Sequence, residues 1–176
     1  PISVPVSGWG AGGWGEGPWG VGSSTTNFIR LWSQSNFGED LIFAYRGGPI
    51  YYWDATTGVG TRGTTLASVA TAAGYDGNFV PNETYQIISS TVQRFCIAFG
   101  ANPYDPTDAA TTFNPMLVRW CDQANPYQWI PETTNQAGEY TLSNGSFIMG
   151  ARSTRQEILV WTDSAIYSMQ YLGAPY

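Results

Sequence analysis

A short apolar segment that ends in an aromatic ring occurs three times in this chain. The copies are residues 42–45 (IFAY), 96–99 (CIAF) and 158–161 (ILVW), so their starts are 54 and then 62 residues apart. A turn-forming region and a second run rich in apolar residues follow each copy, at residues 50–53, 117–120 and 166–169. A repeat of this length indicates a stacked or radially repeated architecture. It predicts three β-hairpins, each with too little apolar surface to be stable by itself.

Every position in the three first segments is apolar, which predicts strands that are covered on both faces. Small sheets that stack face to face around an axis meet this requirement, either as the blades of a β-propeller or as a sandwich. A repeat of roughly 50 residues favours the propeller. Three repeats do not close a ring, since propellers typically have about four to eight blades. We therefore predict an all-β fold of propeller-like antiparallel hairpins, an incomplete propeller that further chain or other subunits complete.

The composition suits short strands and points to covered surfaces. Aromatic residues make up 15% of the chain, glycine accounts for 21 of its 176 residues, and only 11% of the residues are charged. Such a chain is too apolar for disorder and suits strands that are joined by turns rich in glycine and proline. About a quarter of the residues are charged in ordinary soluble domains. We therefore expect other chains to cover much of the exterior.

The first two dozen residues differ in kind from the rest. Trp9, Trp14 and Trp19 recur every five residues within a glycine-rich segment. This density of glycine disfavours a helix or a central strand, whereas the tryptophan rings offer a large apolar surface. We predict an extended arm over residues 1–24 and a β-repeat domain over residues 25–176 that continues past residue 176. The arm binds either its own domain or a neighbouring subunit, and both interpretations stay open.

The hairpin model makes a prediction about the two cysteines. In the first repeat, a four-residue turn places Tyr45 opposite Ile50. The same register in the second repeat places Cys96 opposite Trp120, and Cys121 opposite the residue before Cys96. Neighbouring residues of a strand point to opposite faces of the sheet, so the two cysteines are unable to form a disulfide. We expect two buried free thiols, which suits synthesis in a reducing cytosol.

The chain lacks the residues that several kinds of binding site or catalytic site require. The chain has no histidine and no lysine, and its net charge is −6. This charge argues against a dedicated nucleic-acid binder, but it is compatible with DNA that slides past an acidic surface. No apolar run approaches the ~20 residues that span a bilayer. The early glycines also lack the Gly-Lys-Ser/Thr ending of a phosphate-binding loop.

The acidic residues suit turns better than a catalytic or metal site. Asp54, Asp122 and Asp163 lie at predicted strand ends or in a tight turn, where aspartate commonly accepts hydrogen bonds from its own backbone. We therefore predict no enzyme activity, no cofactor and no metal site. A glycosidase is a third hypothesis, and it requires two carboxyl groups about 5–10 Å apart at a groove.

Three segments resemble structural proteins of tailed bacteriophages. They are residues 39–54, with the string YRGGPIYYWD, residues 119–129, with RWCDQ, and residues 154–163, TRQEILVWTD. With the glycine- and tryptophan-rich start, they make the chain similar to the tail hub, nozzle or DNA-stabilisation proteins of short-tailed phages. The resemblance extends over residues 8–176.

The resemblance implies a propeller-bearing subunit that is synthesised in the host cytoplasm and assembles as a ring in the virion tail. Such a subunit helps to assemble the tail, lines or closes the DNA channel and retains packaged DNA. The implied partners are other copies of the chain and neighbouring tail or portal-adaptor proteins. DNA passes nearby without specific binding, and no membrane is involved.

We expect the subunit contacts to use tryptophan rings and guanidinium groups, because a planar guanidinium suits interface ion pairs. The candidates are Trp9, Trp14, Trp19, Arg46, Arg119, Trp129, Arg152 and Arg155. Trp129 is the candidate for an exposed ring, although packing in the core is the simpler interpretation. The alternative function is a carbohydrate-binding module that recognises host glycan through Trp129. The long loop over residues 100–115 is expected to be a contact or channel element.

Overall fold

The computed structural model describes residues 2–5, 26–90 and 92–173, and it divides the chain into two units, Pro1–Leu31 and Trp32–Tyr176. In the first unit, β1 (Ile2–Pro5) and β2 (Thr26–Ile29) pair antiparallel. The predicted contacts of the arm involve residues that lie outside the described ones, namely Trp9, Trp14 and Trp19. These contacts therefore stay a prediction.

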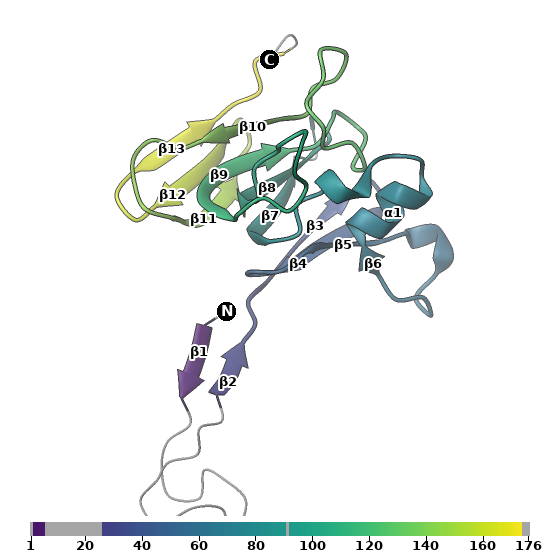
Figure 1. Ribbon diagram of the computed structural model, residues 1–176, viewed down its shortest axis with the longest axis horizontal. Helices are drawn as coiled ribbons and strands as arrows, with labels where there is room; N and C mark the ends of the chain where they lie inside the picture. The colour runs from purple at the N-terminus through teal and green to yellow at the C-terminus, as the bar shows by residue number, and fades with distance from the viewer. Residues whose placement is uncertain (1, 6–25, 91, 174–176) are drawn as a thin grey trace, which may run out of the picture. The chain divides into compact units, whose positions relative to one another are not determined.

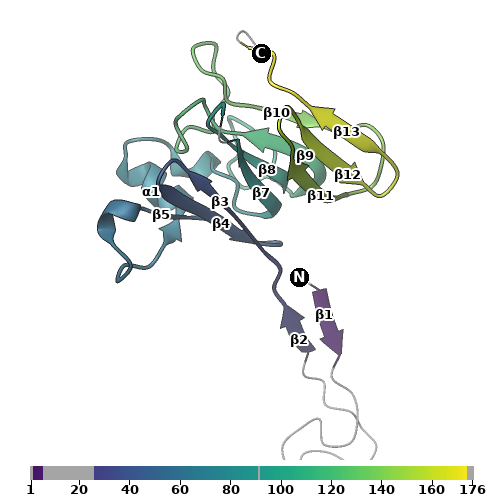
Figure 2. The same cartoon turned by 180° about the vertical axis from the view of Figure 1, so that it is seen from behind.

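Within the described residues, the second unit contains three antiparallel sheets whose strands are hydrogen-bonded in the order of the chain (Figures 1 and 2). The first sheet contains β3 (Trp32–Phe37), β4 (Asp40–Tyr45), β5 (Ile50–Trp53) and β6 (Thr64–Thr65). The middle sheet contains β7 (Thr84–Ser90), β8 (Phe95–Ala101), β9 (Asn114–Trp120) and β10 (Gly138–Thr141). The third sheet contains β11 (Ile148–Ser153), β12 (Ile158–Thr162) and β13 (Ile166–Met169). This arrangement confirms the prediction of an all-β protein.

Short helical segments lie between the first and middle sheets in the chain. The 3₁₀ helix η1 (Ala55–Thr57) precedes β6, α1 (Leu66–Ala72) follows it, and the 3₁₀ helix η2 (Gly77–Phe79) comes before β7. Leu66 and Ala70 are four residues apart and therefore share one face of α1. That face is buried against the core beside the first sheet.

The middle sheet lies between the other two sheets and has an apolar core on each of its faces (Figure 1). Cys96 and Ala98 of β8 belong to the core shared with the first sheet, whereas Ile97 and Phe99 belong to the core shared with the third sheet. This alternation follows from the two-residue period of side chains along a strand. All residues of β8 are buried, which confirms the predicted coverage of both faces for the middle repeat.

The first and third sheets differ from that prediction. In β4 and β12, buried residues alternate with half-buried ones, because each of these sheets has a neighbouring sheet on only one side within the described residues. For these two repeats the described residues cover one face of the sheet, and coverage of the other face by further chain or other subunits stays a prediction. The described sheets do not form a closed ring, and the propeller-like interpretation stays a prediction.

The first hairpin has a different register from the predicted one. Ala44, and not Tyr45, pairs with Ile50. The N–H of Gly48 donates to the carbonyl oxygen of Tyr45 at 3.0 Å, so the turn begins at Tyr45. Pro49 has no N–H to donate to the ladder and ends the turn. The predicted register was therefore wrong by one residue.

The second hairpin shows the same one-residue difference, and it brings the two cysteines together. Ile97 pairs with Trp120, so that Cys121 lies opposite Cys96. The Cys121 N–H donates to the Cys96 carbonyl oxygen, and the Cys96 N–H donates to Cys121 Sγ, both at 3.0 Å. A one-residue change of register moves a side chain to the other face of the strand. The prediction of different faces was therefore wrong, and both residues are buried in one core as free thiols.

Candidate functional site

The first strands of neighbouring sheets are joined by side-chain hydrogen bonds. The hydroxyl oxygen of Ser33 on β3 accepts from the N–H of Ile87 on β7 at 3.1 Å, and Ser35 accepts from the N–H of Ser89 at 3.0 Å. β7 is an edge strand of the middle sheet, so these N–H groups have no partner within their own sheet. The serines therefore satisfy an edge that would otherwise be free to pair with another chain.

Gln86 makes the corresponding connection from β7 to the third sheet. Its side-chain Nε2 donates to the carbonyl oxygen of Ala151 on β11, and its Oε1 accepts from the Ala151 N–H, both at 2.8 Å. β11 is likewise an edge strand of its sheet. We call the contacts between β3, β7 and β11 the seam, because they hold the three sheets together along their first strands.

Arg46 connects all three sheets near the seam. It lies in the turn between β4 and β5, and its guanidinium carbon is 4.2 Å from the ring centre of Tyr85 on β7. Its two terminal nitrogens donate to the carbonyl oxygens of Ile148 and Met149 at 3.5 and 3.4 Å. The guanidinium that the sequence suggested as a contact between subunits thus bridges sheets of its own chain.

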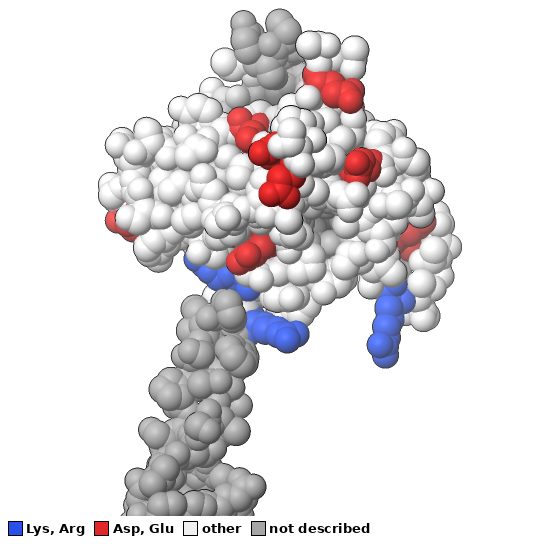
Figure 3. Space-filling view, viewed as in Figure 1, with Lys and Arg blue, Asp and Glu red and all other residues white. Residues whose placement is uncertain are grey.

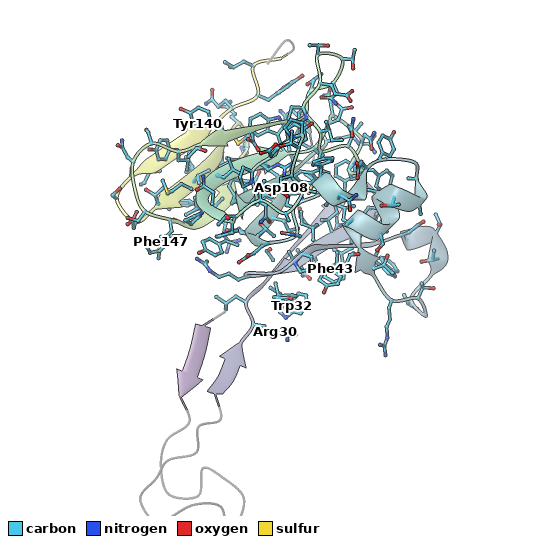
Figure 4. The ribbon with its side chains drawn as sticks, in the orientation of Figure 1. Arg30, Trp32, Phe43, Asp108, Tyr140 and Phe147 are labelled. Atoms are coloured by element: carbon cyan, nitrogen blue, oxygen red, sulfur yellow. The ribbon has the colours of Figure 1, made fainter. Side chains whose placement is uncertain are left out.

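The outward face of the first sheet carries a row of aromatic rings. We call it the aromatic face, and it consists of Trp32, Phe43, Tyr45 and Tyr51. Figure 4 labels Trp32 and Phe43. The rings meet because the residues are cross-strand neighbours: Trp32 lies opposite Tyr45 with ring centres 5.5 Å apart, and Phe43 stacks on Tyr51 at 5.3 Å. Trp32 is 55% exposed, and the other three are half-buried.

Two glycines let these rings lie flat on the sheet. A Cβ atom at Gly48 would lie 2.2 Å from the Tyr45 ring, and one at Gly63 would lie 2.7 Å from the Phe43 ring. Both distances are far below van der Waals contact, so any side chain at these positions displaces a ring. The glycines therefore maintain the shape of the aromatic face.

The outward face of the third sheet is also apolar, and we call it the third-sheet face. It consists of Met149, Arg152, Leu159, Trp161 and Ile166. Met149 is 54% exposed and Ile166 is 65% exposed. Met149, Arg152 and Trp161 line a shallow groove of about 340 Å³ that reaches Gln86 at the seam.

Arg119 is buried, with only 2% of its surface exposed. Its guanidinium donates to the carbonyl oxygens of Asn102, Phe79 and Trp129 at 2.8, 3.0 and 3.0 Å, and its Nε lies 3.5 Å from Glu139 Oε2. Burial lowers the pKa of Arg119 to about 10, and Glu139 offsets part of this effect, so the group stays charged at neutral pH. Arg119 joins loops of its own chain, which corrects the expectation of a bridge to another subunit.

Trp129 is buried as well, with 1% of its surface exposed. Its indole Nε1 donates to the carbonyl oxygen of Pro126 at 2.8 Å, and its ring belongs to the core between the first and middle sheets. The large apolar ring is stabilised by burial once its N–H has a partner. The burial of Trp129 confirms packing in the core, the simpler interpretation, and no face of the ring is open to a sugar.

Arg152 and Arg155 are both exposed. Arg152 belongs to the third-sheet face. Arg155 follows β11 and lines a second groove, of about 670 Å³, between the middle and third sheets. Phe95, Trp120 and Tyr140 contribute apolar surface to this groove.

The acidic residues that the sequence analysis considered accept hydrogen bonds from backbone N–H groups. Asp54 accepts from the hydroxyl group and the N–H of Thr56, which lower the pKa of its carboxyl group, and Asp163 accepts from the Ser146 N–H at 2.7 Å. Asp122 accepts from the backbone N–H groups of Gln123 and Gln136 at 2.8 and 2.9 Å. The local contacts of Asp54 and Asp122 agree with the predicted role in turns, whereas the contacts of Asp163 with Ser146 and of Asp122 with Gln136 join segments that are distant in the chain.

Comparisons with protein-family models, curated protein sequences and solved structures found no match to this chain. Among the residues that the structure describes, no helix has the length and apolar character to cross a membrane. The same residues contain no group of three or more acidic, cysteine or histidine side chains that could hold a metal ion. The two outward faces, with their exposed apolar side chains, and the seam are the candidate functional surfaces.

Proposed function

We propose that the chain is a structural subunit of a phage tail, part of a hub or nozzle ring that helps to assemble the tail, lines or closes the DNA channel and retains packaged DNA. The observation that carries this proposal is the stack of three sheets, which has a core on each face of the middle sheet and an apolar outward face at each end. Such a stack is suited to be one part of a larger assembly, because exposed apolar patches mark sites of protein contact.

We interpret the three sheets as propeller-like blades. In each sheet the strands follow one another in chain order, as they do within a blade. The first strands lie in a row, with β7 in contact with β3 on one side and with β11 on the other. This row corresponds to the inner strands that surround a propeller axis. Three blades form an incomplete propeller, which supports assembly with further blades.

The residues that carry the resemblance to phage tail proteins have structural roles here. Gly48 makes room for the ring of Tyr45, Arg119 joins three loops, and Trp129 fills a core. A motif of this kind preserves the shape of a rigid body. It supports a mechanical function more than a catalytic one.

The distribution of charge supports a role beside DNA. Acidic side chains are spread over the face of the second unit that Figure 3 shows. An acidic surface repels phosphate groups. DNA therefore passes such a wall without being held on it.

Labelling of phage particles tests the proposal. An antibody raised against the chain, used with gold labelling and electron microscopy, is expected to mark the tail end of intact virions. Mass spectrometry of purified virions is expected to detect peptides of the chain. Its absence from purified particles would contradict the proposed function.

The aromatic face also keeps the alternative function open. Trp32 is the most exposed ring on this face and offers an apolar plane on which a sugar ring can stack. In a glycan array, saturable binding that is lost in Trp32→Ala would favour a carbohydrate-binding module. Absence of binding leaves the structural role as the better proposal.

A further inference from the structure

We propose that Asn144 is a site of spontaneous deamidation in the folded chain, and that the reaction loosens the loop before β11 from the third sheet. This modification site goes beyond the proposed function and does not depend on it. Asn144 and Gly145 lie in the loop between β10 and β11, and both are exposed. They form the only Asn-Gly pair in the sequence. Asparagine is a thermolabile residue, because its side-chain amide reacts with its own backbone.

The reaction requires a free side-chain amide and a free N–H on the next residue. The Gly145 nitrogen attacks Asn144 Cγ, the new bond replaces the bond from Cγ to Nδ2, and the proton of the Gly145 N–H leaves with Nδ2 as ammonia. Water then opens the five-membered imide. Cleavage at Cγ gives aspartate, and cleavage at the main-chain carbonyl carbon gives isoaspartate. One water is consumed and one ammonia is released, without oxidation or reduction.

Both reacting groups are available in the structure. The hydrogen bonds of Asn144 are made by its main chain: its N–H donates to the Tyr167 hydroxyl at 2.7 Å, and its carbonyl oxygen accepts from Thr162 Oγ1 at 3.0 Å. Within the described residues, neither the Asn144 side-chain amide nor the Gly145 N–H has a hydrogen-bond partner. A side chain on the second residue would hinder the attack, and glycine has none.

The packing of the loop requires glycine at position 145. Gly145 has a φ of +124°, and a Cβ atom there would lie 2.6 Å from Asp163 Oδ1 and 2.8 Å from Thr162 Oγ1. Glycine adopts this conformation readily and avoids both contacts. The residue that makes Asn144 reactive therefore has a structural role, because it lets the loop lie close to the turn after β12.

Asn82 provides a comparison within the chain. It is also exposed, and its side chain likewise has no hydrogen-bond partner among the described residues. The next N–H, that of Glu83, donates to Asn102 Oδ1 at 3.0 Å, so it is not free to react. Glu83 also carries a side chain. We therefore expect the folded chain to react at Asn144 before it reacts at Asn82.

The reaction changes the loop in two ways. It adds a negative charge next to Gly145, which lies against Asp163, and Asp163 Oδ1 accepts from the Ser146 N–H at 2.7 Å. In isoaspartate the main chain runs through Cβ and Cγ, so it contains one more carbon atom before Gly145. The carbonyl group that accepts from Thr162 then no longer belongs to the main chain. Both changes weaken the contacts between the loop and the turn after β12.

Incubation of the full chain at mildly alkaline pH, followed by proteolysis and mass spectrometry, tests the site. Circular dichroism establishes that the chain stays folded during the incubation. We expect aspartate and isoaspartate at position 144 and release of ammonia, and loss of both products in Asn144→Gln, whose longer side chain cyclises more slowly. Asn82→Gln is the matched control and is expected to react as the unmodified chain does. The proposal is overturned if position 144 stays unmodified, if Asn82 reacts first, or if Asn144→Gln releases as much ammonia as the unmodified chain.

Hydrogen exchange tests the effect on the loop. We expect the Ser146 N–H to exchange faster in the isoaspartate form than in the unmodified chain, because its contact with Asp163 is weakened. Asn144→Asp adds the charge without the extra main-chain atom, so we expect a smaller increase in this variant. An unchanged exchange rate in the isoaspartate form, or an equal increase in Asn144→Asp, would overturn the effect assigned to the longer main chain.

Discussion

The side-chain amide of Gln86 occupies both backbone groups of Ala151, donating to its carbonyl oxygen and accepting from its N–H, each at 2.8 Å. Gln86 belongs to β7 and Ala151 to β11, so one side chain takes the place of a neighbouring strand at the edge of the third sheet. Unpaired strand edges are free to pair with other chains. Gln86 therefore sets the position of the third sheet on the middle sheet and also protects its edge.

Replacement of Gln86 by alanine is expected to lower the free energy of unfolding by about 1–3 kcal/mol, because the N–H and carbonyl of Ala151 lose their partner. Urea unfolding followed by tryptophan fluorescence measures this change. Gln156→Ala removes a similar amide from the exposed turn after β11 and is expected to stay within about 0.5 kcal/mol of the unmodified chain. Equal unfolding midpoints for Gln86→Ala and the unmodified chain would contradict the assigned role.

Replacement of Arg119 by leucine is expected to lower the free energy of unfolding by about 3–5 kcal/mol, because it leaves three loop carbonyls without this donor and removes the cation beside Glu139. Arg119→Lys keeps the charge but loses the planar fork, so we expect it to restore only part of the stability. Arg155→Leu alters an exposed guanidinium and serves as the control. Thermal unfolding compares the stability of the three variants. If Arg119→Leu is as stable as Arg155→Leu, Arg119 does not stabilise the fold by joining the loops.

The repeat was visible in the sequence because buried strands require apolar residues at every second position or more. The residues that are hydrogen-bonded between β3 and β7 show the same repeat distance. Ser33 and Ile87 are 54 residues apart, as are Ser35 and Ser89. This is the offset between the first two hairpins. An alignment of the repeats therefore indicates which strands are neighbours, although it does not identify the hydrogen bonds between them.

The register and the buried polar groups were not predictable from the pattern alone. The position of Cys96 opposite Cys121 depends on where each strand pairing begins, and a change of one residue reverses the face. Arginine is rarely buried unless it is paired, so the sequence favoured a contact between subunits for Arg119. The carbonyl groups of Phe79, Asn102 and Trp129 come together only when the loops fold.

Alkaline pH is expected to destabilise the chain through its two thiols. Burial raises the pKa of Cys121 to about 12 and that of Cys96 well above its ordinary value of 9.0. The unfolded thiols lose their protons above pH 9.0, whereas the folded thiols keep them. Their contribution to stability is therefore complete below pH 9.0 and decreases as the pH rises toward about 12.

Urea unfolding at a series of pH values, with a reductant present, measures this effect. Cys121→Ser removes one of the two thiols and is expected to make the fall in unfolding free energy shallower, by up to about 1.4 kcal/mol per pH unit. Burial also raises the pKa of Tyr52, so part of the alkaline slope remains in this variant. Identical slopes for the variant and the unmodified chain would refute the contribution of Cys121.

Replacement of Gly48 by alanine is expected to disturb the aromatic face, because the new Cβ atom would lie 2.2 Å from the ring of Tyr45. We expect a loss of about 1–3 kcal/mol in the free energy of unfolding, as for other overpacked sites. Gly60→Ala is the matched control, since nothing lies within 4 Å of its Cβ position. Removal of the ring in the double variant Tyr45→Ala, Gly48→Ala is expected to abolish the cost of the second substitution. A double-mutant cycle by urea unfolding measures this coupling. If the losses in unfolding free energy of the two single variants simply add in the double variant, the ring of Tyr45 does not require glycine at position 48.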